Sequence, residues 1–181
     1  ETTRTNLCEL EKRLPEIRAL TLKEPSSFCE ELSDLLTNCG IAPVFLPHLS
    51  GSFLHGATFY DNGKIVMGLT LRGKDADRFW FSLFHEIGHI MLGHLTKSTG
   101  ADNADEEAAD CFAKDVLIPP DEYNSFLKKS TFKREAIIDF AASIGIAPGI
   151  IVGRLQKEGH IDFNQLNDLK VKYELTSNAD F

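Results

Sequence analysis

One segment constrains the fold of this chain more than any other: residues 79–94, with the sequence FWFSLFHEIGHIMLGH. Apolar side chains leave it almost no polar face apart from His85, Glu86 and His89. A helix of this composition is buried nearly all round. Burying two imidazoles and a carboxylate without partners costs on the order of several kcal/mol, so we expect a bound cation and hydrogen bonds at this point of the core.

The polar residues of this segment follow the pattern H-E-x-x-H over residues 85–89. Four residues along a helix correspond to a rotation of roughly 400°, so His85 and His89 project from one face and can each give a ring nitrogen to one zinc ion. Glu86 follows His85 by roughly 100°, where a carboxylate can accept a proton from zinc-activated water. The pattern also occurs by chance, and it is the apolar surroundings that favour zinc here.

We do not expect His94 to be the third zinc ligand. In the metzincin spacing H-E-x-x-H-x-x-G-x-x-H, the third histidine is six residues beyond the second and a glycine is three beyond. Here His94 is five residues beyond His89, and Gly93 is four beyond it. We expect Gly93 to end the helix and His94 to lie near the final carbonyl groups.

The next helical segment offers better candidates, because Glu106 and Asp110 are four residues apart. This spacing favours Glu106 as the third ligand and Asp110 as the acceptor for the N–H of a ligand histidine. Glu107 competes for the same role, but its neighbour four residues on is Cys111, a poor acceptor for an imidazole. The alternative interpretation is a solvated acidic first turn, which is favourable at any helix N-terminus.

The rest of the chain predicts an α+β fold. Leucine and phenylalanine recur at helical spacing within residues 1–40, and further helical patterns follow residue 75. Between them lie short β-rich runs at residues 44–46, 57–60 and 64–71. Asn62-Gly63 between the last two predicts a hairpin. We therefore expect a small antiparallel sheet packed on the H-E-x-x-H helix and its neighbours, with a helical segment at the C-terminal end.

Composition narrows the partners and the compartment. Nineteen Lys and Arg against 27 Asp and Glu give a net charge of −8, so the chain as a whole lacks an attractive field for nucleic acid. The four cysteines form no C-x-x-C pair, which favours reduced thiols. No apolar run approaches the roughly 20 residues of a membrane span. We expect a cytoplasmic protein without membrane contact; because the chain begins with Glu1, an upstream domain remains an open alternative.

Two motifs together resemble the ImmA/IrrE-type zinc metallopeptidases, whose pattern is H-E-x-G-H followed by E-x-x-A-[ND]-x-F-A-x-x-L-x-x-P. The first motif is WFSLFHEIGHIMLGH, and the second is EEAADCFAKDVLIP at residues 106–119. The resemblance covers residues 42–120 and extends more weakly to residue 173. The chain departs from the family at Ala108, where another Glu is frequent, and at Ile118, where Leu or Met is usual.

The resemblance implies a minimal gluzincin-like fold and a zinc endopeptidase, with manganese as the alternative ion in the cell. His85, His89 and Glu106 would be the ligands, and Glu86 the general base. Members cleave a regulatory protein, so we expect a transcriptional repressor of a mobile-element, toxin-antitoxin or stress-response system as substrate. Many members also carry a Xre-type helix-turn-helix, through which an upstream domain could bind DNA. We expect a metallopeptidase-like domain at residues 1–128 and a helix-turn-helix-like C-terminal subdomain at 129–181.

Substrate contacts are less constrained by the sequence. Tyr60, His55 and Tyr123 are candidate donors to the oxyanion of the tetrahedral intermediate, each with a structural role as the alternative. The strand at residues 64–71 could offer an edge on which an extended substrate pairs.

Two other classes of function stay open. Residues 136–156 resemble a helix-turn-helix, although the second helix offers few donors to DNA, namely Arg154, Gln156 and Lys157 at its end. The other class is a non-catalytic metal-binding sensor or transcriptional regulator module, against which Glu86 argues, because a structural zinc site does not need a carboxylate over an open position. The sequence leaves the oligomeric state open.

Overall fold

The computed structural model describes residues 5–46, 56–70, 74–96, 100–129 and 132–173. Two helices, α1 (Leu7–Ala19) and α2 (Pro25–Asn38), precede the strands β1 (Ile41–Leu46), β2 (Gly56–Asp61) and β3 (Lys64–Thr70). The short strand β4 (Lys74–Asp75) leads into α3 (Ala76–Met91), which is followed by α4 (Asn103–Leu117). The remaining elements are α5 (Pro120–Lys128), α6 (Arg134–Ile144), α7 (Pro148–Lys157) and β5 (Lys172–Tyr173), with short 3-10 turns at Leu20–Leu22, His94–Thr96 and Asn167–Leu169. The α+β class is confirmed.

The main sheet is mixed, with strand order β1-β3-β2. β2 and β3 form the antiparallel hairpin expected from Asn62-Gly63, and both turn residues have positive φ, 48° and 80°. β1, however, runs parallel to β3, so the prediction of an antiparallel sheet is wrong for this strand. An Asn-Gly turn fixes only the two strands that it joins, whereas the direction of β1 depends on a longer connection that carries no such signal.

The strand at residues 64–71 does not offer an edge. Its described part, β3, is the central strand and is paired on both sides, so the prediction that it receives a substrate is wrong. β2 is an outer strand of the sheet, and α3 contacts both β2 and β3.

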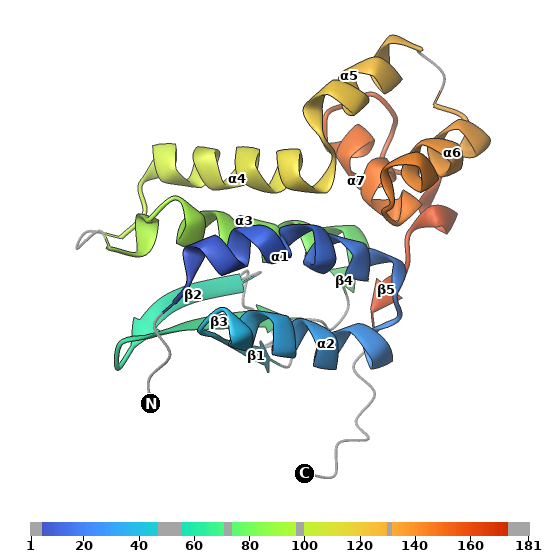
Figure 1. Ribbon diagram of the computed structural model, residues 1–181. Coiled ribbons are helices and arrows are strands. Elements are labelled where there is room, and N and C mark those ends of the chain that lie inside the picture. Colours follow the sequence, from blue (N-terminus) through green and yellow to red (C-terminus); the bar gives the residue numbers. More distant parts are fainter. Residues whose placement is uncertain (1–4, 47–55, 71–73, 97–99, 130–131, 174–181) are drawn as a thin grey trace.

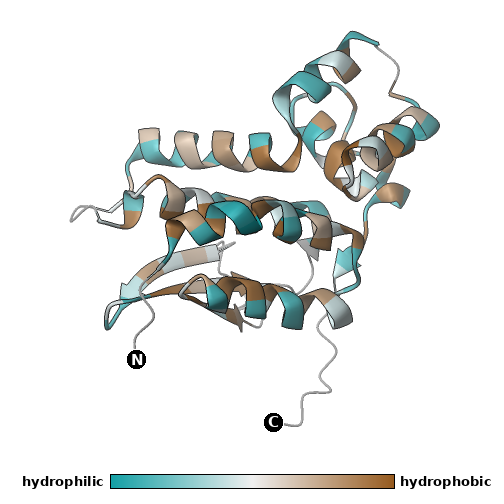
Figure 2. Cartoon of the chain, viewed as in Figure 1, coloured by the Kyte–Doolittle hydropathy of each residue, from teal (hydrophilic) through white to brown (hydrophobic). Residues whose placement is uncertain are grey.

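The core lies between the sheet and the helices (Figure 1). α2 buries Phe28, Leu32 and Leu36, while hydrophobic and hydrophilic stretches alternate along its ribbon (Figure 2). Of the helices that pack against the sheet, α3 is the most buried, with Phe79, Trp80 and other apolar residues inaccessible to solvent. Its environment agrees with the all-round burial expected from the sequence.

The C-terminal helices form a group that contacts α3 through α7 (Figure 1). β5 pairs with β4, and Trp80 donates a hydrogen bond from its Nε1–H to the Tyr173 hydroxyl at 2.7 Å. Arg18, at the end of α1, donates from Nε to the Leu117 carbonyl at 2.9 Å and from Nη1 to the Ile144 carbonyl at 2.6 Å. One guanidinium thus joins the C-terminal ends of α1, α4 and α6, and these contacts cross the expected boundary at residues 128–129.

No single helix in the described ranges is long and apolar enough to cross a membrane. α6 and α7 meet the length and composition criteria only as a pair, and a bend of 115° separates them.

Candidate metal centre

The centre is built where α3 and α4 pack closely. Gly88 allows this approach, because a Cβ at this position would lie 3.2 Å from Ala109 Cα and 3.3 Å from its carbonyl oxygen. The two helices therefore meet along a glycine and an alanine. Side chains one turn to either side of this contact face one another across the helix interface.

Three of the residues expected to bind metal come together at this interface. His85 Nε2 lies 3.1 Å from His89 Nε2 and 3.2 Å from Glu106 Oε2, and His89 Nε2 lies 3.4 Å from Glu106 Oε1. A tetrahedral ion with ligand bonds of about 2.0–2.1 Å separates its ligands by about 3.3–3.4 Å. These three residues therefore form a group that could hold a metal ion.

The hydrogen bonds outside this group determine which atoms face its centre. His85 Nδ1 lies 2.8 Å from Asp110 Oδ1, and an ionised carboxylate can only accept, so the Nδ1–H donates. In neutral His85 the Nε2 lone pair then points at His89 and at the Glu106 carboxylate. Converging lone pairs repel one another unless a cation lies between them, so the donor set fits a divalent ion.

The sequence assigns His94 to the end of the helix and gives no sign of its contact with His89 or of the contact between Thr58 and Glu86. His94 is buried in the turn after α3; its Nδ1 lies 2.9 Å from His89 Nδ1, and its Nε2 lies 3.3 Å from Asp105 Oδ1. Asp105 also accepts a hydrogen bond from the backbone of Asp102 and so takes part in the N-terminal cap of α4. His94 therefore contacts and can orient the candidate ligand His89, a role that the spacing of ligands along the sequence does not reveal.

Glu86 lies beside the group without joining it. It is 8% exposed, and the Thr58 hydroxyl donates to its Oε2 at 2.6 Å. Burial raises the pKa of the Glu86 carboxyl, while the Thr58 hydrogen bond and His85 oppose this rise and Glu106 adds to it. Gly56 of β2 is needed at this point, because a Cβ there would come within 2.9 Å of Glu86 Cγ and Oε1. The carboxylate is thus held between α3 and β2.

Burial also lowers the pKa of His89, and the neighbouring His85 lowers it further, while Glu106 opposes the shift. The neutral imidazole is the form that binds metal. His89 is therefore kept in the protonation state that a metal ligand requires.

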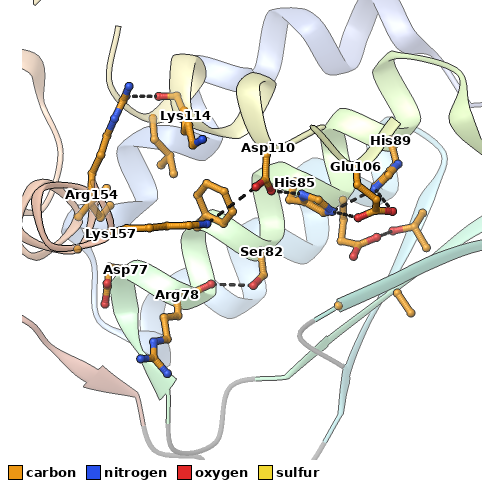
Figure 3. A pocket seen from close by; sticks show the side chains of 18 of the residues that line it. Asp77, Arg78, Ser82, His85, His89, Glu106, Asp110, Lys114, Arg154 and Lys157 are labelled. Carbon is orange, nitrogen blue, oxygen red and sulfur yellow. Dashed lines mark hydrogen bonds and ion pairs between the residues drawn. The ribbon is translucent and has the colours of Figure 1, made fainter. Parts of the chain in front are cut away.

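The candidate metal-binding group, formed by His85, His89 and Glu106, opens into a cavity of about 1090 Å³. β2 lines one side, α3 and α4 contribute the metal-binding group, and α7 lines the end opposite it. In Figure 3, His85, His89 and Glu106 lie together at one side of the view, and Arg154 and Lys157 extend from the other. The cavity is large enough to admit several residues of an extended peptide.

The three candidate oxyanion donors have different positions. Tyr60, on β2, lines the cavity and is 51% exposed. Tyr123 is buried, donates its hydroxyl to Glu158 Oε2 at 2.7 Å and is not among the residues lining the cavity. Its pKa is raised by burial and by this hydrogen bond. His55 lies outside the described residues.

α7 does not resemble an exposed recognition helix. Gln156 is buried and donates from Nε2 to carbonyl oxygens of Phe163 and Gln165. Arg154 donates to Glu158 and to the carbonyls of Lys114 and Ile118, its guanidinium lying 4.0 Å from the centre of the Tyr123 ring. Lys157 lines the cavity. All three donors are directed to the protein itself or to the cavity.

No protein-family model matches this chain, and no curated protein matches it significantly.

Proposed function

We propose that this protein is a metal-dependent endopeptidase of gluzincin-like type, similar to the ImmA/IrrE-type metallopeptidases, which cleaves a regulatory protein of the repressor class. One observation carries the proposal. Two histidines and a glutamate converge within ligand distance of one another, and a second, buried glutamate lies beside them over an open cavity. A purely structural metal site has no need of the second carboxylate or of the cavity.

The residues present fit zinc. His85 and His89 would bind it through Nε2 and Glu106 through its carboxylate; manganese is the alternative, because the set includes an oxygen ligand. When bound, the ion supplies Lewis acidity towards a carbonyl oxygen and lowers the pKa of water. Asp110 and His94 hold the two imidazoles in the orientation in which their Nε2 atoms converge.

Glu86 supplies the proton transfer. Its carboxylate takes one proton from water as the water oxygen bonds to the carbonyl carbon, and it returns that proton to the nitrogen as the C–N bond breaks. The Thr58 hydroxyl donates to Oε2 of Glu86 and so fixes the orientation of the carboxylate, while Oε1 does not accept this hydrogen bond. Burial raises the pKa of Glu86 towards the range in which a carboxyl can both accept and donate a proton.

β2 provides the place for the substrate backbone. It is an outer strand of the three-stranded sheet, and its residues 56–60 line the cavity beside Glu86. An extended peptide that pairs with such an edge gains main-chain hydrogen bonds without any requirement on its sequence. Tyr60, near the end of this strand, is the candidate oxyanion donor that lines the cavity.

The decisive experiment uses Glu86→Gln. We expect it to retain zinc with unchanged stoichiometry but to cleave a random decapeptide library at least about a hundredfold more slowly, because the proton acceptor is lost. Metal content is measured by elemental analysis and cleavage by mass spectrometry. Glu107→Gln, which removes the same charge from an exposed site on α4, is the control and should cleave normally.

Two outcomes would contradict the proposal. If Glu86→Gln cleaves as well as the unaltered protein, the assigned base is wrong. If the unaltered protein binds zinc but cleaves neither the library nor a candidate repressor, the chain is better described as a metal-binding sensor.

A further inference from the structure

The cavity differs in charge between its two ends. Near the metal-binding group, Glu86, Glu106 and Asp110 line it. The rest of the cavity is lined by five basic residues, Arg78, Lys114, Arg154, Lys157 and Lys170, and by two acidic ones, Asp77 and Glu158; of these, Lys157 reaches to within 3.9 Å of Asp110. The whole chain has a net charge of −8, so this excess of basic side chains is a local feature. The part of a cavity in which one sign of charge predominates attracts ligands of the other sign.

Not all of these cations are available to a ligand. Lys170 pairs with Asp77 at 3.0 Å, and both side chains are nine-tenths buried. Arg154 pairs with Glu158 at 3.0 Å. By contrast, no ion pair of Arg78 is present in the part of the chain that the structure describes, and Lys157 has a longer ion pair, 3.9 Å from Asp110 Oδ2, with its side chain 60% exposed. Lys114 also has no ion pair among the described residues, but it is only partly exposed, so Arg78 and Lys157 are the more exposed cations of the lining.

Lys157 extends over the ring of Phe81, and both residues line the cavity. Its Nζ lies 4.6 Å from the centre of the Phe81 ring and 3.9 Å from Asp110 Oδ2. Phe81 is four residues before His85 on α3, and the centres of their rings are 6.4 Å apart. The ammonium group thus approaches the metal-binding group from α7 (Figure 3), separated from His85 by the single carboxylate of Asp110.

Arg78 extends the same path. On α3 it precedes Ser82 by four residues and His85 by seven, a spacing that places the three on one helix face, and all three line the cavity. The Ser82 hydroxyl donates to the Arg78 carbonyl at 2.8 Å. From His85 outward, the cavity therefore presents first Lys157 and then Arg78.

We propose that Lys157 and Arg78 form a subsite that binds an acidic side chain, glutamate or aspartate, of the substrate peptide; this inference rests on the proposed function. An extended peptide advances roughly 3.3 Å per residue, so the acidic residue lies within a few positions of the scissile bond. A lysine in the last turn of a helix is favourable in any protein. Lys157 differs from such a lysine because it lies over an aromatic ring inside the cavity.

The first test compares substrates. The zinc-loaded protein is given a random decapeptide library, and we expect Glu and Asp to be enriched within three positions of the cleaved bonds. Two peptides that differ only by Glu or Gln at the enriched position are then compared. We expect kcat/KM to favour Glu by about fivefold, the upper range for an ion pair at a partly exposed site.

Variants assign this preference to the two cations. Lys157→Met, which retains the cover over Phe81, and Arg78→Gln should each lower the Glu-to-Gln ratio, and Lys157→Glu should reverse it in favour of a peptide with Lys at that position. Lys128→Met removes an exposed lysine from the last turn of α5 and should leave the ratio unchanged. Unchanged ratios in all three subsite variants would overturn the proposal.

The second test does not require cleavage. Binding of the same labelled peptides to Glu86→Gln is measured by fluorescence anisotropy; if the library gives no cleavage, peptides retained by this variant are identified by mass spectrometry. Acid preference in binding without cleavage would support the subsite and contradict the peptidase. Cleavage or retention without acid preference would overturn the subsite alone.

Discussion

At the scale of single residues, the two proposed histidine ligands are supported in different ways. Asp110 accepts directly from Nδ1 of His85, whereas His89 reaches the Asp105 carboxylate only through the ring of His94. With His89 bound to metal through Nε2, its Nδ1–H donates to His94 Nδ1, and His94 Nε2–H then faces Asp105. The second imidazole thus extends the carboxylate-histidine arrangement by one side chain.

This arrangement predicts the effect of removing His94. His94→Leu should weaken zinc affinity by about 10- to 100-fold, because His89 loses the partner that fixes its tautomer and orientation. Affinity is measured by competition with a chromophoric chelator. His160→Leu, which removes an imidazole from the C-terminal helical region, serves as the control, and an unchanged zinc affinity in His94→Leu would show that the contact is incidental.

Thr58 predicts a change in pH dependence. Its hydroxyl stabilises the ionised form of Glu86 and so lowers a pKa that burial raises. In Thr58→Val the pKa of Glu86, the proposed general base, should be higher. Less of this carboxyl would then be ionised at a given acidic pH, and the acidic limb of kcat/KM should move to higher pH. The pH profile of peptide cleavage measures this shift. Thr58→Ser should restore the limb, and a limb that stays in place in Thr58→Val would exclude Thr58 as the controlling partner.

At the scale of elements, the sequence predicts local features well and pairings between distant segments poorly. The spacing of His85 and His89 on one helix, and of Glu106 and Asp110 on the next, depends only on helical periodicity, and the structure brings all four together. The support from His94 depends on how the turn after α3 folds back, which no periodicity encodes. The parallel pairing of β1 likewise depends on a connection without a local signal.

The buried hydroxyl of Tyr173, in the strand β5 that pairs with β4, predicts a change in stability at alkaline pH. Burial of the Tyr173 hydroxyl raises its pKa to about 12, while the hydrogen bond from Trp80 opposes the rise. Above the ordinary pKa of 10 the unfolded chain loses this proton and the folded chain keeps it. Stability therefore falls between pH 10 and pH 12, by about 2–3 kcal/mol over the whole interval.

Tyr173→Phe should lack this loss. It is expected to be less stable than the unaltered protein at pH 8, because the Trp80 N–H loses its acceptor, and the difference should shrink as the pH rises above 10. Urea unfolding at each pH measures both free energies of unfolding. A difference that stays constant from pH 8 to pH 12 would contradict the assignment to Tyr173.

At the scale of the whole molecule, contacts from all parts of the chain hold the cavity together. Arg18 binds the last carbonyls of α4 and α6, and α7 lines the cavity opposite the metal-binding group. The sequence predicts a division at residues 128–129. The contact between Arg18 and the Ile144 carbonyl crosses this division and joins residues 126 positions apart, a separation over which the sequence carries no local pattern. The composition of α7 offers donors to DNA, but composition does not show that Gln156 is buried and donates to carbonyl groups of the protein itself.

Zinc should stabilise the whole chain. Because the three proposed ligands come from two helices, the folded protein should bind the ion better than the unfolded chain does. At a free zinc concentration of about 100 times Kd, the gain is about 2.7 kcal/mol, which corresponds to roughly 5–10 °C in Tm for a chain of this size. Thermal unfolding with zinc and with EDTA measures the shift. His85→Ala should lose it, and an equal shift in this variant would point to binding elsewhere.

The first turn of α4 contains both Asp105, which takes part in the capping box and contacts His94, and Glu106, the proposed third ligand. Unwinding of this one turn would detach a ligand and release the support of His89 in the same event. Helix ends fray far more often than whole domains unfold. The ion would then leave the protein at the rate at which this single helical turn opens. A partner that binds over the turn and keeps it closed could retain the metal without contacting it.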